Sequence, residues 1–261
     1  MDILSEIVVS KRKEVAERKE LYPKKLLEKS IYFEGKPVSL KKYIQREDKS
    51  GVIAEIKRKS PSKGIINEHV SVERTSIGYM QAGASGLSVL TDKTYFGGSS
   101  EDLMTARSFN FCPILRKDFM IDEYQVIEAK SIGADVILLI AAVLSKEEIE
   151  VLGGLARSLG MESLLEVHNE EELNNSITDK VDLIGVNNRN LKTFETSIQT
   201  SKDLVSKIPD EFVKVTESGL QSPEVVNELK EYGYEGFLIG ESFMKSGRTE
   251  RAAKEFISKI R

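Results

Sequence analysis

The chain has 261 residues, with 38 basic and 42 acidic side chains interspersed along the sequence and a formal net charge of −4. This balance leaves no broad basic surface to hold nucleic acid or an anionic membrane, so we expect no partner of either kind. A single cysteine, Cys112, excludes an internal disulfide, and with two histidines it leaves no cluster of zinc ligands, so we expect no metal and a packing role for this cysteine.

The N-terminus and the apolar runs indicate where the protein acts. The first six residues lack the basic segment and apolar core of a secretory signal, and no apolar run approaches the about 18 residues that cross a bilayer. We therefore expect a cytoplasmic protein, and we expect it to be a monomer.

Apolar residues at helical spacing predict three helices before the first strand. The first spans residues 2–20, a short second helix lies around residues 26–27, and Ser39 is the predicted N-cap of a third over residues 40–46. We assign residues 1–48 to a helical extension.

From residue 50 onward, short apolar strands alternate with helices. Strands are predicted at residues 52–56, 86–91, 113–116, 136–140, 163–167, 183–186, 212–215 and 236–239. Helices are predicted at residues 72–82, 100–108, 123–132, 146–159, 170–176, 197–206, 223–232 and 248–260. Parallel strands need helical crossovers and bury both sheet faces, and eight such units in about 210 residues fit a closed barrel better than an open sheet. We therefore predict an α/β fold, a (β/α)8 TIM barrel, in a single domain over residues 1–261.

Charged and amide side chains stand where the predicted strands end, which is where the active sites of such barrels lie. Glu55 and Lys57 are two apart on the first strand, so their carboxylate and ammonium face one space. The other strand ends carry Lys117 and Asp118, Glu166, Asn187 and Arg189, Glu217 with Ser218 and Gly219, and Gly240 with Glu241 and Ser242. Gathering so many charges at one mouth is costly without a polar ligand, so an active site is expected here.

Three segments are expected to converge on one anion. The backbone N–H groups of Gly219 and Gly240 stand just before the predicted seventh and eighth helices, where phosphate commonly binds in this fold. Ser60 adds a hydroxyl from a loop beside the eighth strand. Glu241 would oppose a phosphate unless its carboxylate turns away. The alternative is that the two glycines only supply tight turns.

Two ring systems near the mouth have different predicted roles. Phe119, beside Lys117, is the better candidate for contact with a substrate ring, whereas Phe96 belongs either to an aromatic wall or to a loop tip. His168, two residues after Glu166, is predicted to be a hydrogen-bonding residue of the rim rather than a catalytic one.

Together these motifs resemble the indole-3-glycerol phosphate synthase family, in that family's order and over essentially the whole chain. The resemblance is carried by residues 55–62, 90–92, 95–99, 116–119, 133–135, 138–140, 185–191, 217–219 and 238–240. Glu241 departs from the pattern because some members have a serine there, which puts a side-chain hydroxyl contact to phosphate in doubt.

The resemblance implies an anthranilate-derived sugar phosphate as substrate, 1-(2-carboxyphenylamino)-1-deoxyribulose 5-phosphate, which a carboxy-lyase of tryptophan biosynthesis converts to indole-3-glycerol phosphate, carbon dioxide and water. It implies no metal and no cofactor. Lys117 is the expected first acid, Glu166 a general acid/base, and Lys57 a contact for the substrate carboxylate or phosphate and a candidate second acid. The expected supporting catalytic residues are Glu55, Asn187 and Glu217. The expected substrate-binding residues are Ser60, Phe96, Phe119, Arg189, Leu191, Ser218, Gly219, Gly240 and Glu241.

Two other functions fit the same residues. An aldolase-like enzyme would use Lys117 as a Schiff-base nucleophile, which needs a lowered pKa, although nearby glutamates would keep this lysine protonated. A barrel that only binds a phosphate ligand would lack a complete set of acids and bases.

Overall fold

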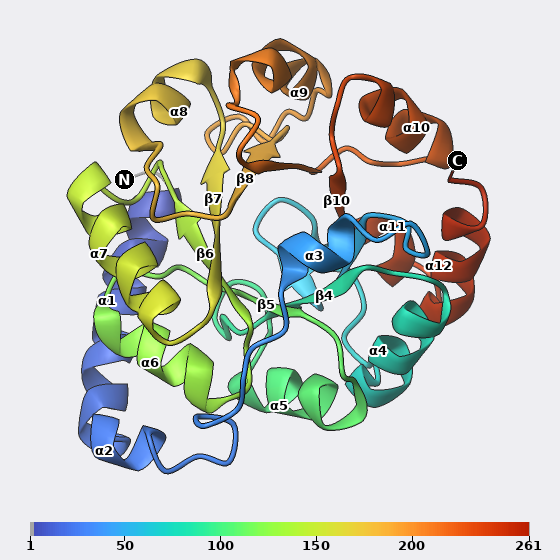
Figure 1. Cartoon of the computed structure of the whole chain (residues 1–261). Coiled ribbons are helices and arrows are strands. Elements are labelled where there is room, and N and C mark those ends of the chain that lie inside the picture. Colours follow the sequence, from blue (N-terminus) through green and yellow to red (C-terminus); the bar gives the residue numbers. More distant parts are fainter. Residues whose placement is uncertain (1–2, 261) are drawn as a thin grey trace.

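Eight parallel strands form one closed barrel in the computed structural model, which describes residues 3–260 (Figure 1). The barrel strands are β1 (Val52–Ile56), β4 (Gly86–Leu90), β5 (Ile114–Lys117), β6 (Val136–Ile140), β7 (Glu162–Val167), β8 (Leu183–Asn187), β9 (Val213–Glu217) and β10 (Gly236–Ile239). They follow one another in chain order around the barrel, and β10 pairs with β1 to close it. The predicted (β/α)8 TIM barrel is confirmed. Residues 1, 2 and 261 of the predicted single domain, including the predicted first residue of the opening helix, lie outside the described residues.

Helices follow the strands and cover the outside of the barrel. They are α4 (Val72–Gln81), α5 (Ser100–Phe109), α6 (Glu123–Ser131), α7 (Lys146–Ser158), α8 (Glu170–Ser176), α9 (Gln199–Leu204), α10 (Pro223–Glu231) and α12 (Thr249–Ile257). Several begin at a side chain that accepts a hydrogen bond from the first turn, as Ser145 does in a capping box with Glu148. None of the helices in the described part of the chain is long and apolar enough to cross a membrane.

Short elements were not predicted. They are the hairpin of β2 (Lys59–Ser60) and β3 (Gly64–Ile65), the 3-10 turn η1 (Val205–Lys207) and the helix α11 (Glu241–Met244). Each is too short for a hydrophobic period to show in the sequence. The consequence for the site is that Gly240 precedes α11 rather than the closing helix α12.

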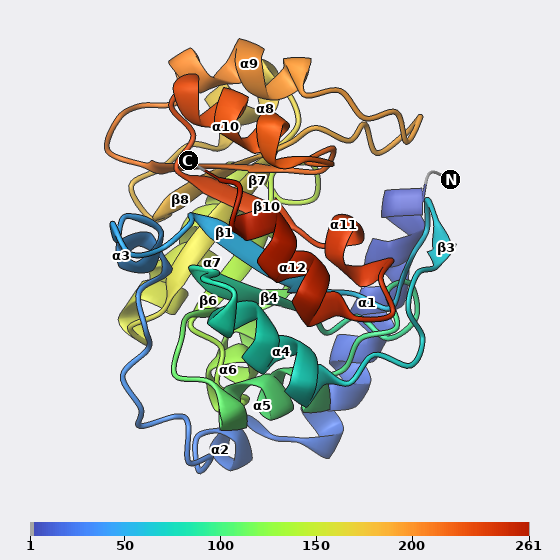
Figure 2. The same ribbon diagram turned by 90° about the vertical axis from the view of Figure 1, so that its right-hand side faces the viewer.

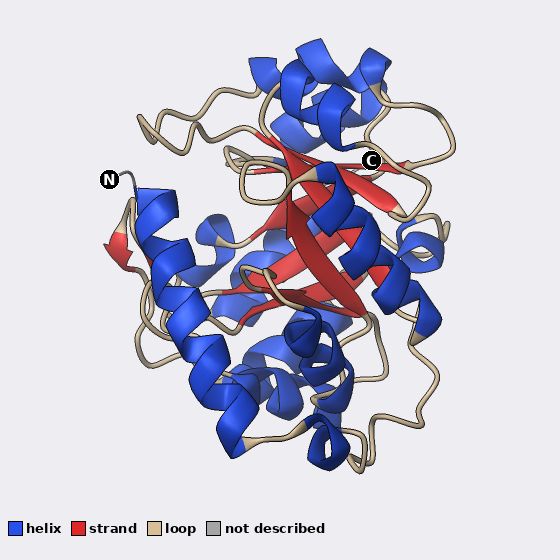
Figure 3. Ribbon diagram, turned by 90° about the vertical axis from the view of Figure 1, so that its left-hand side faces the viewer, coloured by secondary structure: helices blue, strands red, loops and turns tan. Residues whose placement is uncertain are grey.

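The extension reaches both ends of the barrel. Leu40 and Ile44 of α3 (Leu40–Ile44) are buried with the apolar side chains that fill the barrel interior, so α3 seals the amino-terminal end (Figure 1). The long helix α1 (Ile3–Leu21) runs along the outside of the barrel to the opposite end, and α2 (Lys24–Leu27) links the two. Figures 2 and 3 show the start of α1 beside the β2–β3 hairpin.

Candidate active site

A cavity of about 690 Å³ opens at the carboxyl ends of the barrel strands. Every residue predicted for catalysis or substrate binding lines it, although the residues come from all parts of the chain. The cavity also has walls that the sequence did not indicate, including Lys245 of the end of α11 and the start of α1 at Ile3, Leu4 and Ile7. The extension therefore borders the site directly.

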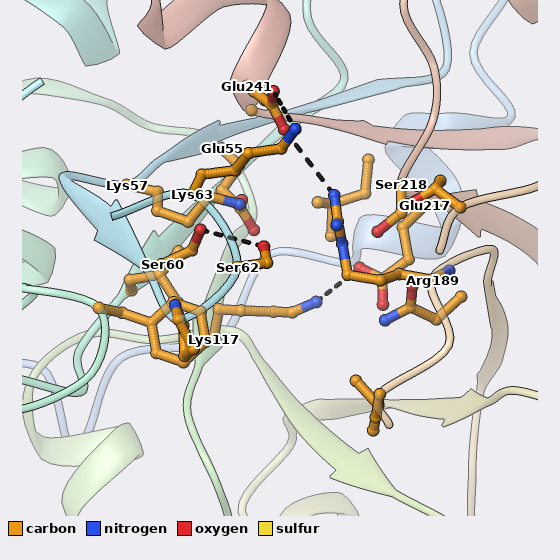
Figure 4. A pocket seen from close by; sticks show the side chains of 18 of the residues that line it. Glu55, Lys57, Ser60, Ser62, Lys63, Lys117, Arg189, Glu217, Ser218 and Glu241 are labelled. Atoms are coloured by element: carbon orange, nitrogen blue, oxygen red, sulfur yellow. Dashed lines mark hydrogen bonds and ion pairs between the residues drawn. The ribbon is translucent and has the colours of Figure 1, made fainter. Parts of the chain in front are cut away.

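Lys117 lies at the centre of the polar part of the cavity. The alternation of side chains along β5 turns Leu115 and Lys117 inward and Arg116 outward. The Lys117 ammonium lies 2.5 Å from Glu217 Oε2, two residues labelled in Figure 4, and 3.2 Å from Glu166 Oε2. Burial lowers the pKa of this amine, but the surrounding carboxylates outweigh burial and hold the pKa above its usual value. Lys117 is therefore charged and able to donate a proton.

The two carboxylates beside Lys117 have pKa values displaced in opposite directions. Burial raises both, yet the charge of Lys117 holds the pKa of Glu166 well below its usual value. Burial and the neighbouring charge of Glu166 keep the pKa of Glu217 well above its usual value. Like charges in one buried site oppose each other's ionisation, so the two carboxyls hold protons with unequal affinity. The mouth thus contains two carboxyls beside one lysine, one with a lowered pKa and one with a raised pKa.

Glu55 and Lys57 form a second ion pair, with Lys57 Nζ 2.5 Å from Glu55 Oε1. Burial raises the pKa of the Glu55 carboxyl, but the charges of Lys57 and Lys117 outweigh it and lower the pKa. The backbone of Gly240 packs tightly here, because a Cβ at this position would lie only 2.7 Å from Glu55 Oε1. The pair faces the same cavity as Lys117.

The predicted anion site contains turns, hydroxyls and cations. Ser218 and Gly219 both have a positive φ, 67° and 78°, and the side-chain hydroxyls of Ser60 and Ser62 lie 3.4 Å apart. At the α11 side, Glu241 does not turn away, because its carboxylate lines the cavity and faces three cations. These are Lys245 at 2.6 Å and, both labelled in Figure 4, Arg189 at 3.8 Å and Lys63 at 3.9 Å. Cations and hydroxyls from three loops therefore surround one small volume.

Another part of the cavity lining is apolar. The rings of Phe96 and Phe119 lie with their centroids 6.1 Å apart, and Leu138, Ile140 and Leu191 also line the cavity. A cavity lined by both apolar and charged side chains suits a ligand with an aromatic part and an anionic part.

A second ionic cluster, behind Lys117 on the outer side of β5, was not predicted. Lys11 of α1 is buried, and its ammonium lies 2.9 Å from Asp92 and 3.0 Å from Asp118. Asp92 also accepts backbone hydrogen bonds from Tyr95 and Phe96. Lys11 thus fixes α1 to the loop that carries Phe96 and to the end of β5, where Asp118 follows Lys117. No short-range signal in the sequence distinguished it from the other cations of the first helix.

Comparison with known proteins identifies close relatives. The family model described as indole-3-glycerol phosphate synthase matches residues 4–256. Curated proteins named indole-3-glycerol phosphate synthase are 47% identical in Bacteroides thetaiotaomicron, over 99% of each chain, and 44% identical in Dechloromonas aromatica, over 94% of each chain. One from Caldanaerobacter subterraneus subsp. tengcongensis is 42% identical over 99% of each chain. Among solved structures, a thiamine phosphate pyrophosphorylase from Pyrococcus furiosus matches with a TM-score of 0.59 and 14% identity over 81% of this chain and 96% of that chain, which bears on the barrel fold alone.

Proposed function

The chain belongs to the indole-3-glycerol phosphate synthase family and forms indole-3-glycerol phosphate, and we propose that it does so in the cavity at the carboxyl ends of the barrel strands. The proposed substrate is 1-(2-carboxyphenylamino)-1-deoxyribulose 5-phosphate, and the proposed reaction class is that of a carboxy-lyase. The observation that supports this site best is the Lys117 ammonium between Glu166 and Glu217, two carboxyls whose pKa values are displaced in opposite directions.

In the proposed first step, the ring carbon that bears the carboxylate attacks the ketone carbon of the substrate. The ketone oxygen then needs a proton, and Lys117 is the group best suited to supply it, because it is charged and desolvated. Loss of carbon dioxide follows. Dehydration then needs a base for a proton of the methylene group between the nitrogen and the former ketone carbon, for which we propose Glu166. It also needs an acid for the hydroxyl that leaves the former ketone carbon, for which we propose Lys57.

Substrate binding divides between the apolar and the charged parts of the cavity lining. We propose that the anthranilate ring lies against Phe96, Phe119 and Leu191, with its carboxylate near Lys57. The phosphate is proposed to bind the backbone of Ser218, Gly219 and Gly240, the Ser60 hydroxyl and the cation of Arg189, in place of the Glu241 carboxylate. Glu55, Asn187 and Glu217 are proposed to hold the sugar hydroxyls and the lysines in place.

The Schiff-base alternative is less well supported. A nucleophilic lysine needs a lowered pKa, whereas the carboxylates around Lys117 raise it. The mouth also has both a proton donor and an ionised acceptor, which a barrel that only binds a ligand would not need.

The remaining sequence-based expectations complete the proposal. We propose a cytoplasmic monomer that needs neither metal nor cofactor and does not bind nucleic acid, consistent with mixed charges that sum to −4. Residues 1–48 are proposed to act as an extension of the same domain, and their contacts at both ends of the barrel support this.

The test is the appearance of the indole product when the purified protein meets the proposed substrate. We expect a rise in indole fluorescence with one carbon dioxide released per product. Borohydride treatment in the presence of a keto-sugar phosphate should trap no covalent adduct on Lys117. Absence of turnover at any substrate concentration, or a trapped adduct, would contradict the proposal.

A further inference from the structure

Two buried polar atoms beside Glu166 have no hydrogen-bond partner. Within residues 3–260 they are the only buried side-chain nitrogen or oxygen atoms of this kind: Nε2 of His168 and Oε1 of Glu217. Buried polar groups in native proteins are nearly always paired, so two unpaired atoms next to one carboxylate point to a functional reason. Glu217 is part of the proposed machinery already, but His168 is not.

Glu172 holds His168 at the Nδ1 side of the ring and at the backbone N–H. Its Nδ1 lies 3.0 Å from Glu172 Oε2, and the same oxygen accepts a hydrogen bond from the backbone N–H of His168 at 2.8 Å. The side chain of His168 is only 9% exposed, so the ring has little freedom to turn away. The free nitrogen Nε2 lies 3.4 Å from Glu166 Oε1. The sequence-based expectation of a hydrogen-bonded rim residue is therefore met at Nδ1 and not at Nε2.

The ring lies between two carboxylates that favour its charged form. Burial lowers the pKa of His168, but its interactions with Glu166 and Glu172 outweigh burial and raise the pKa to about 10. The charged ring forms an ion pair with Glu166 Oε1 at 3.4 Å through Nε2, without a hydrogen bond in this arrangement. The imidazolium and the Lys117 ammonium thus approach Glu166 through its two different oxygens.

We propose that His168 is a positioning residue for Glu166: anchored by Glu172, its ring places Nε2 beside the carboxylate and keeps this carboxylate ionised and oriented in the cavity. The inference rests on the proposed role of Glu166 as the acid/base of the reaction. It explains why Glu166 remains a base although it is buried and lies next to the second carboxylate, Glu217.

The groups that act on Glu166 determine the direction of the expected pH effect. Lys117 from β5, His168 and Glu217 from β9 favour its ionised form, whereas burial and the charge of Glu55 from β1 disfavour it. Asn187 from β8 is neutral and donates a hydrogen bond at 3.2 Å. Removing the charge of His168 therefore raises the pKa of Glu166. The acid limb of the kcat profile, which reports the base in the substrate complex, moves to higher pH.

The test compares kcat and KM from acid to alkaline pH for His168→Asn and His168→Gln. Asn cannot reach Glu166, so we expect the acid limb to move up by about one pH unit, kcat near neutral pH to fall roughly 10-fold, and KM to stay within about threefold. Gln can place a hydrogen-bond donor near Glu166 but carries no charge. It should therefore recover part of kcat without returning the acid limb to its wild-type pH. Glu172→Gln keeps a hydrogen-bonding side chain beside His168 and should move the acid limb in the same direction by a smaller amount. This variant keeps the test decisive if a His168 variant fails to fold.

Controls separate this inference from the proposed function. His69→Asn changes the exposed histidine and should leave the profile unchanged. Glu166→Gln should lose activity at every pH; if it remained active, the role of Glu166 itself would be wrong. If Glu166→Gln is inactive while His168→Asn and Glu172→Gln reproduce the wild-type profile, or shift it to lower pH, His168 has only a structural role and the inference is overturned.

Discussion

The two sides of β5 carry two ionic clusters that differ in their completeness. On the outside, Arg116 and Asp118 belong to a network that reaches α1 through Lys11 and α6 through Glu128. On the inside, Lys117 meets Glu166 and Glu217 at the wall of the cavity. One strand thus contributes consecutive residues to two clusters of similar composition.

The outer cluster is closed. Asp118 accepts hydrogen bonds from Thr91 and from the N–H of Phe119 as well as pairing with Lys11, and Glu128 pairs with both Arg18 and Arg116. The inner cluster is open, because it borders the cavity and because one oxygen of Glu217 and Nε2 of His168 have no hydrogen-bond partner. A buried network with every atom paired stabilises one conformation, whereas an incomplete one retains groups for a ligand.

The largest expected effect is on catalysis, from Lys117→Met in the inner cluster. Methionine keeps the length and removes the proton, so kcat should fall by about 10²- to 10⁴-fold with KM within a few-fold. Steady-state kinetics with the fluorescent product measures both. If kcat instead remains near the wild-type value, Lys57 is the acid of ring closure and the division of roles is wrong.

The next effect is on stability, from Lys11→Met in the outer cluster. Removal of Lys11 leaves Asp92 and Asp118 buried without their cation, which costs about 3–5 kcal/mol and lowers Tm by about 6–20 °C. The matched control is Lys19→Met, also on α1, whose pair with Asp122 is 2.7 Å long but largely exposed and should cost at most about 1 kcal/mol. Equal Tm values for the two variants would show that the outer cluster is not stabilising.

A smaller effect is expected on binding, from Gly219→Asp at the phosphate side of the cavity. The added charge should raise KM by roughly 10- to 100-fold, the equivalent of one lost charge-assisted hydrogen bond. Gly219→Asn is the control. Asparagine has the shape of aspartate without its charge, and at this position it meets the same positive φ of 78° and the same close approach to Thr196. Identical KM values for the two variants would show that the phosphate does not bind at this position.

The smallest expected effect is on the free energy of unfolding at acid pH, to which the outer cluster contributes. Burial raises the pKa of Asp118, but the charges of Lys11 and Arg116 outweigh it and lower the pKa from 3.8 to about 2. A depressed carboxyl pKa contributes stability that is complete above about pH 4 and lost as pH falls toward 2, here roughly 2 kcal/mol. In Lys11→Met most of this contribution is absent, so urea unfolding should show the stability difference from wild type narrowing below about pH 4. If the stability difference between wild type and Lys11→Met were independent of pH, the lowered pKa of Asp118 would not depend on Lys11.

The inner cluster could be predicted from the sequence and the outer one could not. Strand alternation is a local rule, so Leu115 and Lys117 point inward together, and the barrel rule places Glu166 and Glu217 at the same mouth. The partners of Lys11 depend on how α1 packs against the barrel, which no local period encodes. The orientation of Glu241 depends on α11, whose four residues are too few to show a helical pattern.

The most direct test of the contrast measures kcat and Tm side by side for Lys117→Met and Lys11→Met. We predict that Lys117→Met loses at least about 100-fold in kcat with the smaller fall in Tm, because the open cavity lets Glu166 take up water or a proton. Lys11→Met should show the larger fall in Tm and, at a temperature where it is folded, retain kcat within about 10-fold. Equal losses of kcat in the two folded variants would contradict the account.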